Sequence, residues 1–238
     1  MSNLSAAISA LQAGKPVLLY DADGREEETD IVLPAASASP DMIRMLRQDA
    51  GGLLCVTVSP EHHHKLGLPF LADTFAGMSA KHPVLAEMRA NDVRYDATKP
   101  AFGIPINARA TFTGITDQDR SLTITTLAAF LSKLPKLTPD DARSEFGHLF
   151  RAPGHVHLLN GAAQGLAARQ GHTELSTELM RQAGLLPSAV LCEMLSPTMG
   201  RALGKKDAMA YAKQHGLVFL TGQDVVSAWQ AKSVPTSA

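Results

Sequence analysis

The order of helical and extended segments along the chain predicts a layered α/β or α+β fold. Apolar stretches of strand length recur throughout, and segments with helical spacing of apolar residues lie between them. No internal repeat or low-complexity linker divides the 238 residues. A chain of this length can bury a substantial core, and we expect one domain over residues 1–238.

Cap residues and apolar patterns define the elements of the N-terminal half. Ser39 and Ser59 each precede a proline, and a Ser cap with Pro in the first turn is typical of a helix start. The helix that begins after Ser39 should end at Gly51 and Gly52. The other elements expected here are a helix over 4–13 and strands over 16–20, 31–36 and 53–58.

The C-terminal half shows the same alternation. Helices are expected over 123–134, from Thr173 to Gly184, and over 205–215 and 223–230, with a loop over 135–140. Strands are expected over 155–159, 189–194 and 217–220. Residues 81–106 carry no readable pattern, so no element is assigned to them.

Charge and cysteine content indicate a soluble protein of a reducing compartment. The 22 Lys and Arg residues nearly balance the 23 Asp and Glu residues, so there is no basic field for nucleic acid. No apolar stretch approaches membrane-spanning length, and Met1–Ser5 lacks the segments of a signal peptide. Two cysteines without a paired spacing indicate free thiols. We therefore expect a cytoplasmic protein that binds neither nucleic acid nor membrane.

The acidic run at residues 25–30, Arg-Glu-Glu-Glu-Thr-Asp, is the most informative feature of the sequence. If the run is extended, Glu26, Glu28 and Asp30 lie on one side and the residues between them on the other. Carboxylates held that close repel unless a cation compensates them, and oxygen ligands suit Mg²⁺ or Mn²⁺. A solvated hairpin tip is the alternative, because charge runs usually face water.

A second polar cluster, Arg169-Gln170-Gly171-His172-Thr173-Glu174, lies at an expected helix start. Thr173 is the natural N-cap, and free amides at such a start favour an anion. Arg169 can add a forked donor, so this turn could hold a phosphate group. His172 could bind a metal beside the carboxylates, although a single histidine is more often structural.

Glu193 lies in the otherwise apolar stretch 189–194. Burial without a partner raises the pKa of a carboxyl group, which suits it to acid–base chemistry near neutral pH. Glu193 is therefore expected to be either a paired group or a catalytic acid or base.

Several of these segments resemble the 3,4-dihydroxy-2-butanone 4-phosphate synthase family, which makes the four-carbon precursor of riboflavin. Over about residues 5–230, six motifs stand in the order seen in that family. They are residues 20–30, 50–55, 113–120, 152–156, 169–174 and 190–193. Many bacterial members read Asp-Arg-Glu-Asn-Glu-Gly-Asp at the first motif, where this chain has Gly24 and Thr29. Residues 81–106 resemble archaeal-type members more closely.

The resemblance implies a fold, a reaction and a site. The fold would be a compact α+β arrangement with a mixed twisted sheet flanked by helices. The reaction would convert ribulose 5-phosphate, over two divalent cations, to 3,4-dihydroxy-2-butanone 4-phosphate and formate. The metal ligands would be Glu26 and His172, and the catalytic pair His155 and Glu193. The positions that match substrate contacts are Arg25, Glu26, Asp30, Arg169, Gln170, Gly171, His172 and Thr173. Additional positions are Glu28, Cys55, Thr113, Asp119 and Arg120, of which the last three lie in a stretch that resembles a phosphate-binding segment.

The expected mechanism begins when cations polarise the carbonyl and hydroxyl groups of ribulose 5-phosphate, which stabilises an enediolate after proton removal. The base would be one of Glu26, Glu28, His155 and Glu193. Members of the family usually form homodimers with sites at the subunit interface, and His155 would then serve the neighbouring chain's site. The acidic loop is expected to order over bound substrate and exclude water.

Two other functions stay open at this stage. A metal-dependent isomerase or aldolase acting on a pentulose phosphate would use the same metal and enediolate, and formate release separates it from the synthase. A non-catalytic nucleotide- or RNA-binding module would need a basic groove where Glu26, Glu28 and Asp30 stand.

Two features are expected to play no metal or redox role. His62, His63 and His64 are consecutive, and neighbours on a helix point about 100° apart, so the three rings do not converge and a solvated helix start is expected. Cys55 lies in an apolar stretch, where an inert core thiol is usual, although its position in the family leaves a substrate-facing role open.

Overall fold

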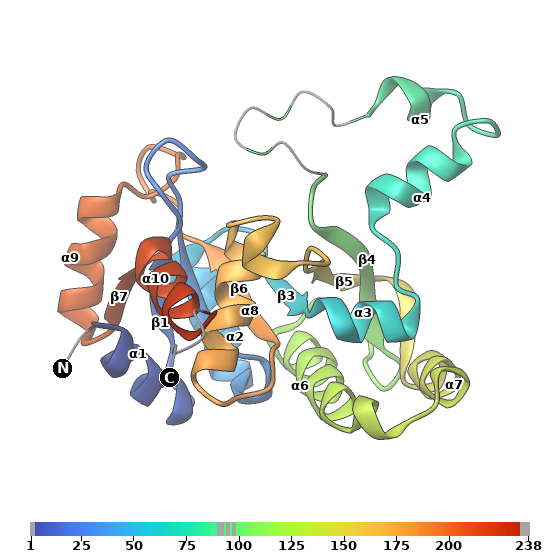
Figure 1. Ribbon diagram of the computed structural model, residues 1–238, viewed down its shortest axis with the longest axis horizontal. Coiled ribbons are helices and arrows are strands. Elements are labelled where there is room, and N and C mark those ends of the chain that lie inside the picture. The colour runs from blue at the N-terminus through green and yellow to red at the C-terminus, as the bar shows by residue number, and fades with distance from the viewer. Residues whose placement is uncertain (1–2, 90–92, 94–95, 97–98, 234–238) are drawn as a thin grey trace.

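Seven strands form one mixed sheet through the centre of the molecule (Figure 1). The computed structural model of the chain describes residues 3–89, 93, 96 and 99–233. The strands are β1 (Val17–Tyr20), β2 (Thr29–Pro34), β3 (Cys55–Val58), β4 (Phe102–Ala108), β5 (Phe150–Asn160), β6 (Ala189–Glu193) and β7 (Val218–Thr221). They lie in the order β4-β5-β3-β6-β2-β1-β7. The pairs β1–β7 and β3–β5 are parallel and the other pairs antiparallel, so the expected mixed sheet of an α+β fold is confirmed.

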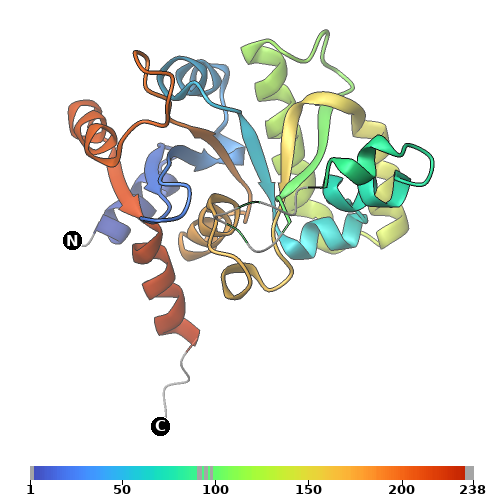
Figure 2. The same ribbon diagram turned by 90° about the horizontal axis from the view of Figure 1, so that it is seen from above.

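Helices cover both faces of this sheet. The helices are α1 (Asn3–Gln12), α2 (Pro40–Met45), α3 (Pro60–Leu66), α4 (Leu71–Met78), α5 (Val84–Glu87), α6 (Asp117–Lys133), α7 (Pro139–Leu149), α8 (His172–Gln182), α9 (Lys205–His215) and α10 (Gly222–Ser233). Figure 2 shows α8 and α10 on one side of the sheet and α2 and α6 on the other. Within the part of the chain described, no helix combines the length and apolar character needed to cross a membrane.

Each face has its own apolar core. Leu179 of α8 and Leu11 of α1 pack with Leu191 of the sheet on one face. On the other face, Phe130 and Leu131 of α6 join a cluster that includes α2 and α9. Alternate strand residues point to opposite faces, which is why strands such as β1, β2 and β6 contribute to both clusters. In contrast, α4 and α5 project away from the sheet and contain no buried residue (Figure 1).

Local signals placed several elements as expected. Helix α2 begins at Pro40, where the Ser39 hydroxyl accepts a hydrogen bond from the Met42 amide at 3.3 Å. A π-helical turn continues it to Ala50, and Gly51 ends it with a φ of 86°. Helix α9 covers the whole expected range 205–215 and is followed by Gly216 at a φ of 64°. These positive φ values favour glycine because it has no Cβ.

Other segments differ from the expectation. Helix α6 begins at Asp117 rather than at 123, because the Thr116 hydroxyl caps it by accepting from the Asp119 amide. In the loop expected over 135–140, residues 135 and 136 belong to a 3₁₀ turn, and α7, which had no predicted counterpart, starts at Pro139 behind the capping Thr138. Strand β4 lies in the stretch that had no readable pattern, and it is recognised only by its pairing with β5.

Two predictions about the polar motifs were wrong. Helix α8 begins two residues earlier than expected, with Gly171 rather than Thr173 as its N-cap. The acidic run is not extended throughout: β2 starts at Thr29, and residues 21–28 connect β1 to β2 by a turn in which Glu27 has a φ of 59°. The tight turn forces this departure from a regular strand, because left-handed backbone is incompatible with a pleated ladder.

Candidate active site

A pocket of about 310 Å³ lies between the acidic loop, the start of α8 and the adjoining strands β3 and β6. Nine residues singled out from the sequence line it, although they come from distant parts of the chain. They are Arg25, Glu26, Glu28, Asp30, Cys55, Arg169, His172, Thr173 and Glu193. The three alternate carboxylates of the acidic run thus face one space, and Arg25, expected on the opposite side, joins them because the run turns.

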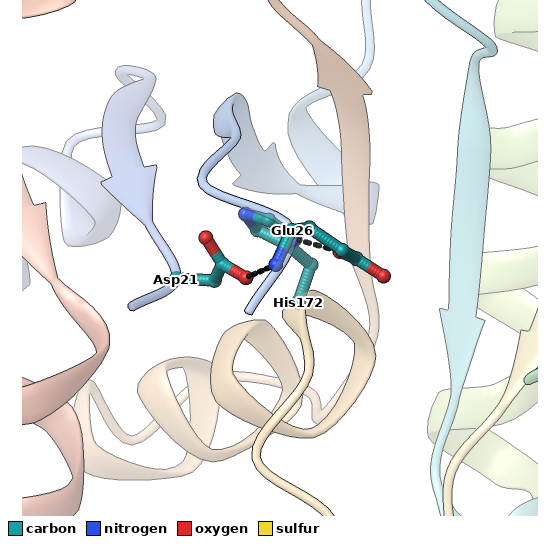
Figure 3. Close-up of side chains that lie close together, drawn as sticks. All are labelled: Asp21, Glu26 and His172. Carbon is teal, nitrogen blue, oxygen red and sulfur yellow. Dashed lines mark hydrogen bonds and ion pairs between the residues drawn. The ribbon is translucent and has the colours of Figure 1, made fainter. Parts of the chain in front are cut away.

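Asp21 gives the acidic loop its shape. Its buried carboxylate accepts hydrogen bonds from the backbone amides of Glu26 at 3.0 Å and Glu28 at 3.1 Å. It also accepts from Arg25 Nη1 at 3.1 Å, and the same Arg25 nitrogen lies 2.8 Å from Glu26 Oε2. Figure 3 shows the Asp21 carboxylate against the Glu26 backbone, with His172 alongside. One buried group therefore holds the loop around the pocket.

His172 is in contact with two carboxylates. Its Nδ1 lies 3.1 Å from Glu26 Oε2, and its Nε2 lies 3.6 Å from Asp30 Oδ1. Burial alone lowers the pKa of this imidazole, but the negative charges of Asp30, Glu26 and Asp21 outweigh burial and raise the pKa to about 9. The raised pKa favours the protonated ring, whose positive charge then lies beside Glu26 and Asp30.

Asp30 is 1% exposed and faces Glu193 across the β2–β6 ladder. Burial raises its pKa to about 8, an effect that His172 opposes and the neighbouring carboxylates, Glu193 first, reinforce. Burial also raises the pKa of Glu28, with Glu26 and Glu193 adding to the rise. The alternative of a fully solvated hairpin tip is therefore wrong at Asp30.

The donor set of this cluster suits a hard divalent cation. Ligand atoms of Asp21, Glu26 and His172 all lie within 4.8 Å of one another. Both carboxylate oxygens of Asp30, and Nε2 of His172, are buried without a hydrogen-bond partner among the described residues. Buried polar atoms are rarely left in that state. Carboxylate oxygens with one imidazole nitrogen match the preferences of Mg²⁺ and Mn²⁺.

Two arginines border the cluster. Arg169 donates through Nη1 to Glu174 at 2.8 Å and through Nε to Asp96. Arg25 also reaches Asp96, at 3.4 Å. Burial opposes the charge on Arg169, but Glu174 and Asp96 outweigh burial and raise its pKa. The Arg169 guanidinium thus stays charged beside the first turn of α8.

Gln170 and Gly171 lie next to the pocket without lining it. Gln170 faces an adjoining cavity that Lys205 and Gly222 also line. Gly171 packs against both arginines: a Cβ there would come within 2.3 Å of Arg169 Nη1 and 2.6 Å of Arg25 Nη2. A glycine is therefore needed for the two guanidinium groups to meet at the helix start.

Glu193 and Cys55 form the wall of the pocket contributed by the sheet. Glu193 Oε2 accepts a hydrogen bond from the Leu53 amide at 2.8 Å. This carboxylate therefore has the hydrogen-bond partner that a polar group within an apolar strand requires. Cys55 is 1% exposed, and burial raises the pKa of its thiol well above the usual range. Both cysteines are free and buried, as expected for inert thiols.

His155, Thr113, Asp119 and Arg120 lie outside the lining of this pocket. His155 is an exposed residue of β5, which borders β3 on the side opposite to β6. Two strand spacings, about 10 Å, therefore separate the backbone near His155 from that near Glu193. The Asp119 carboxylate accepts hydrogen bonds from the Thr113 and Gly114 amides at 3.2 and 2.8 Å. These two donors of the expected phosphate-binding stretch therefore already bind a carboxylate of the protein.

The His62–His64 tract differs from the expected solvated helix start. His62 is 6% exposed, and His63 contacts the Gly161 carbonyl at 2.9 Å, whereas His64 is exposed. Burial lowers the pKa of His62 and of His63. Two of the three rings therefore pack against the protein, and the Gly161 carbonyl that His63 contacts directly follows β5.

Three residues with clear structural roles were not singled out from the sequence. Asp21 lies inside the first motif, and its position before the turn was an available signal. Asp96 belongs to the unreadable stretch, and Asn107, which contacts His155, belongs to a strand revealed only by pairing. No local pattern marks Asp96 or Asn107, because the side chains that they hold, Arg169 and His155, are more than 45 residues away in the sequence.

Sequence comparison identifies proteins of one kind. The family profile described as 3,4-dihydroxy-2-butanone 4-phosphate synthase matches residues 5–228. The synthase of Methanothermobacter thermautotrophicus is 46% identical over 223 residues, covering 94% of each chain. That of Pseudomonas putida is 35% identical over 224 residues, covering 94% of this chain and 88% of its own. The greater similarity to the archaeal protein agrees with the archaeal character expected of the middle segment.

Structural comparison gives the same result. A crystal structure of a 3,4-dihydroxy-2-butanone 4-phosphate synthase in complex with two magnesium ions superposes with a TM-score of 0.71 at 28% identity. The match covers 97% of this chain and 98% of that one. The similarity therefore extends over the sheet and both helical layers.

Proposed function

Since the chain belongs to the 3,4-dihydroxy-2-butanone 4-phosphate synthase family, we propose that the acidic pocket is the active site for the family's reaction. The enzyme is a lyase of riboflavin biosynthesis, which converts D-ribulose 5-phosphate to L-3,4-dihydroxy-2-butanone 4-phosphate and formate. The observation that carries the assignment of the site is the buried pair of Asp30 and His172: the Asp30 oxygens and His172 Nε2 have no hydrogen-bond partner among the described residues, and His172 Nδ1 lies 3.1 Å from Glu26.

Glu26 and His172 are the proposed metal ligands. Their facing atoms lie 3.1 Å apart, and Asp21 holds the Glu26 backbone in place. We propose two Mg²⁺ or Mn²⁺ ions per site, since a structural relative binds two magnesium ions. A bound divalent cation would polarise the carbonyl and hydroxyl groups of the sugar phosphate and favour loss of the proton between them.

The start of α8 is the proposed site for the substrate phosphate. Arg169 and Arg25 bring two charged guanidinium groups to a helix N-terminus that no side chain caps within the described residues. Backbone amides at a helix start together with forked arginine donors favour a phosphate. Thr173 lines the same pocket and supplies a further hydroxyl, and Asp30 is placed to accept from substrate hydroxyl groups.

Glu193 and Glu28 are the proposed acid–base groups of the pocket. Glu193 is held at the end of β6 by the Leu53 amide, so its position is fixed before substrate binds. Burial and like charges raise the pKa of Glu28, which brings a second carboxyl group closer to neutral pH. Proton removal next to the substrate carbonyl, followed by skeletal migration and loss of formate, requires such groups on both sides of the sugar.

His155 is proposed to act on the site of a neighbouring chain. It is exposed and lies at the same end of the sheet as Glu193, with β3 between them, although it does not line the pocket of its own chain. A homodimer with shared sites would bring the two together.

We also propose that the protein is located in the cytoplasm, because both buried cysteines are free thiols, as is usual in a reducing compartment.

Formate release tests the proposal directly. Purified protein incubated with ribulose 5-phosphate and Mg²⁺ should release formate in equal amount to the butanone phosphate, and EDTA should abolish the release. Glu193→Gln should lower turnover roughly a hundredfold or more while substrate still binds. Arg169→Ala should weaken substrate binding roughly ten- to hundredfold, because a charge-assisted donor contributes about 1.5–3 kcal/mol. Consumption of the sugar phosphate without formate would indicate an isomerase or aldolase and would contradict the proposal.

A further inference from the structure

The imidazole of His155 is held by the side chain of one buried residue, Asn107. Asn107 is 4% exposed and lies at the end of β4. Its Oδ1 accepts a hydrogen bond from the His155 backbone amide at 2.8 Å, and its Nδ2 lies 3.1 Å from His155 Nδ1. The amide therefore contacts both the backbone and the ring of the same histidine.

The orientation of the Asn107 amide is fixed by its other partners. The backbone N–H of His155 can only donate, so the atom that faces it must be the carbonyl oxygen Oδ1. The carbonyl of Thr113 can only accept, and it lies 3.4 Å from the opposite atom, which must then be Nδ2. Two independent contacts thus exclude the flipped amide. Because Nδ2 carries only hydrogens, His155 Nδ1 must be the acceptor.

The surrounding backbone leaves this contact little freedom. The register of β4 against β5 changes from Ile106–Val156 to Asn107–Arg151, so residues 152–155 bulge around the Asn107 side chain. A Cβ on Gly154 would come within 2.0 Å of the Ile106 carbonyl carbon, and a Cβ on Gly114 within 2.0 Å of Asn107 Nδ2. The two glycines let the bulge and the Thr113 loop close on the amide, which restricts the imidazole to one orientation.

We propose that Asn107 is a positioning residue that keeps the neutral His155 ring protonated at Nε2, so that this nitrogen donates a hydrogen bond and does not act as a base. A neutral imidazole whose Nδ1 accepts has its proton on Nε2. A carboxylate in place of the amide would accept from Nδ1–H and leave Nε2 as a base, so an amide and a carboxylate at this position have opposite effects.

For the reaction, this inference rests on the proposed function. It removes His155 from the groups that could abstract the substrate proton and leaves the carboxylates of the pocket for that role. The outward Nε2–H can instead donate to an oxygen on which negative charge develops. The titratable and charged groups near the ring are His157 on the same strand, Asp119 behind the Thr113 loop and Arg151, which donates to the Thr111 and Phe112 carbonyls.

The tautomer can be measured in the unmodified protein. Two-bond ¹H–¹⁵N correlation spectra of the ¹⁵N-labelled enzyme, without substrate, distinguish a protonated Nε2 from a protonated Nδ1. Comparison with His155→Asn assigns the signals. We expect the Nε2–H pattern for His155 at pH values where the ring is neutral. A Nδ1–H pattern would overturn the proposal, and it would do so whether or not the protein releases formate.

Asn107→Asp tests the consequence for catalysis. In this variant the carboxylate takes Nδ1–H, so the neutral ring presents a lone pair at Nε2 and only the imidazolium presents Nε2–H. Turnover should therefore fall about tenfold or more on the alkaline side and recover as the pH falls and the ring gains a proton. The wild-type enzyme should lack this alkaline loss. Turnover in the variant equal to or above wild type at alkaline pH would show that His155 acts as a base, and would overturn the inference.

Asn160→Asp is the matched control. Asn160 is a buried asparagine of the neighbouring strand β5, but its amide donates to the Pro69 carbonyl and not to a histidine. The variant Asn160→Asp should therefore show no loss of turnover on the alkaline side of the pH profile. Thermal unfolding of both variants, followed by circular dichroism, identifies losses that come from a buried charge alone. If wild-type enzyme released no formate while the Nε2–H signal was present, the proposed function would fail and the tautomer assignment would stand.

Discussion

Helices α6 and α8 both begin in polar motifs that indicated phosphate binding, yet their first turns differ. At α6 the Thr116 hydroxyl accepts from the Asp119 amide, and the Asp119 carboxylate accepts from the amides of Thr113 and Gly114. At α8 the N-cap is Gly171, and no side chain of the described residues caps the turn. At the start of α6 the backbone amides already donate to the Asp119 carboxylate, whereas the amides at the start of α8 stay available for a bound anion.

The electrostatic environments of the first turns of α6 and α8 differ as well. Asp119 is half-buried, and the amides that donate to it, Gly114 first, lower its pKa. His172, the first residue of α8, is buried among carboxylates that raise its pKa. A helix start with similar residues is therefore a structural turn in one place and part of a candidate active site in the other. The sequence motif alone does not distinguish them, because the distinction depends on what packs in front of the amides.

The largest difference between the two starts should appear in metal binding. We expect His172→Ala and Glu26→Ala each to weaken Mg²⁺ binding by more than the roughly 10- to 100-fold that loss of a residue supporting a ligand produces. Turnover should fall accordingly. Calorimetric titration with Mg²⁺ and formate assays measure both effects.

Two controls belong with this experiment. Asp119→Ala, at the other helix start, and His64→Ala, an exposed residue at the end of α3, should leave Mg²⁺ affinity unchanged. Equal loss of affinity in Asp119→Ala would place the cation near α6 and remove the contrast between the helices.

A smaller effect is expected from Gly171→Ala, which should separate binding from stability. The new methyl group would meet the ends of the Arg169 and Arg25 side chains, which are flexible and can move aside. Unfolding should change little, while the dissociation constant for ribulose 5-phosphate should rise roughly tenfold, because charge-assisted donors are displaced.

Gly147→Ala in α7 is the matched substitution, since a Cβ there meets nothing within 4 Å. It should leave substrate affinity unchanged. If Gly171→Ala bound substrate as tightly as Gly147→Ala, the arginines at α8 would have no part in phosphate binding.

The α6 start should respond to pH rather than to substrate. Backbone amides lower the pKa of Asp119 below its ordinary 3.8 in the folded protein, so its stabilising contribution is complete above about pH 4. That contribution is lost as the pH falls through the lower folded value. Asp119→Asn should therefore be less stable than wild type at pH 7, and the difference should shrink below pH 4. Urea unfolding from pH 3 to 7 measures this trend, and a constant difference would contradict it.

The smallest effect is expected from Thr116→Ala. Loss of a threonine cap costs about 1 kcal/mol, which for a chain of this size lowers the melting temperature by about 2–4 °C. Substrate and Mg²⁺ affinities should not change, because the cap lies outside the pocket. Calorimetry and binding titrations test the two statements separately. A loss of affinity with unchanged melting temperature would move part of the binding site to α6.

Where a short stretch of sequence contains the whole cause, prediction succeeded. Ser39 with Pro40 marks the start of α2, Gly216 marks the end of α9, and both signals act within one helical turn. The alternation of Glu26, Glu28 and Asp30 placed three carboxylates in one pocket even though the run turns. Thr116 and Thr138, in contrast, are equally local caps that were not recognised, so the beginnings of α6 and α7 were missed.

The sequence by itself determined the family and the fold that the resemblance implies, through six ordered motifs, and the types of side chain that gather at the pocket, because each motif is a property of a short stretch of residues. Only the tertiary structure decided which helix start stays open, that Asp21 and Asp96 hold the loop and the arginines, and that Asn107 directs His155. Asn107 and His155 are 48 residues apart and meet only because β4 pairs with β5 through a bulge. Such contacts depend on strand register and on the absence of a Cβ at Gly114 and Gly154, and these conditions are set by the packing of the whole sheet.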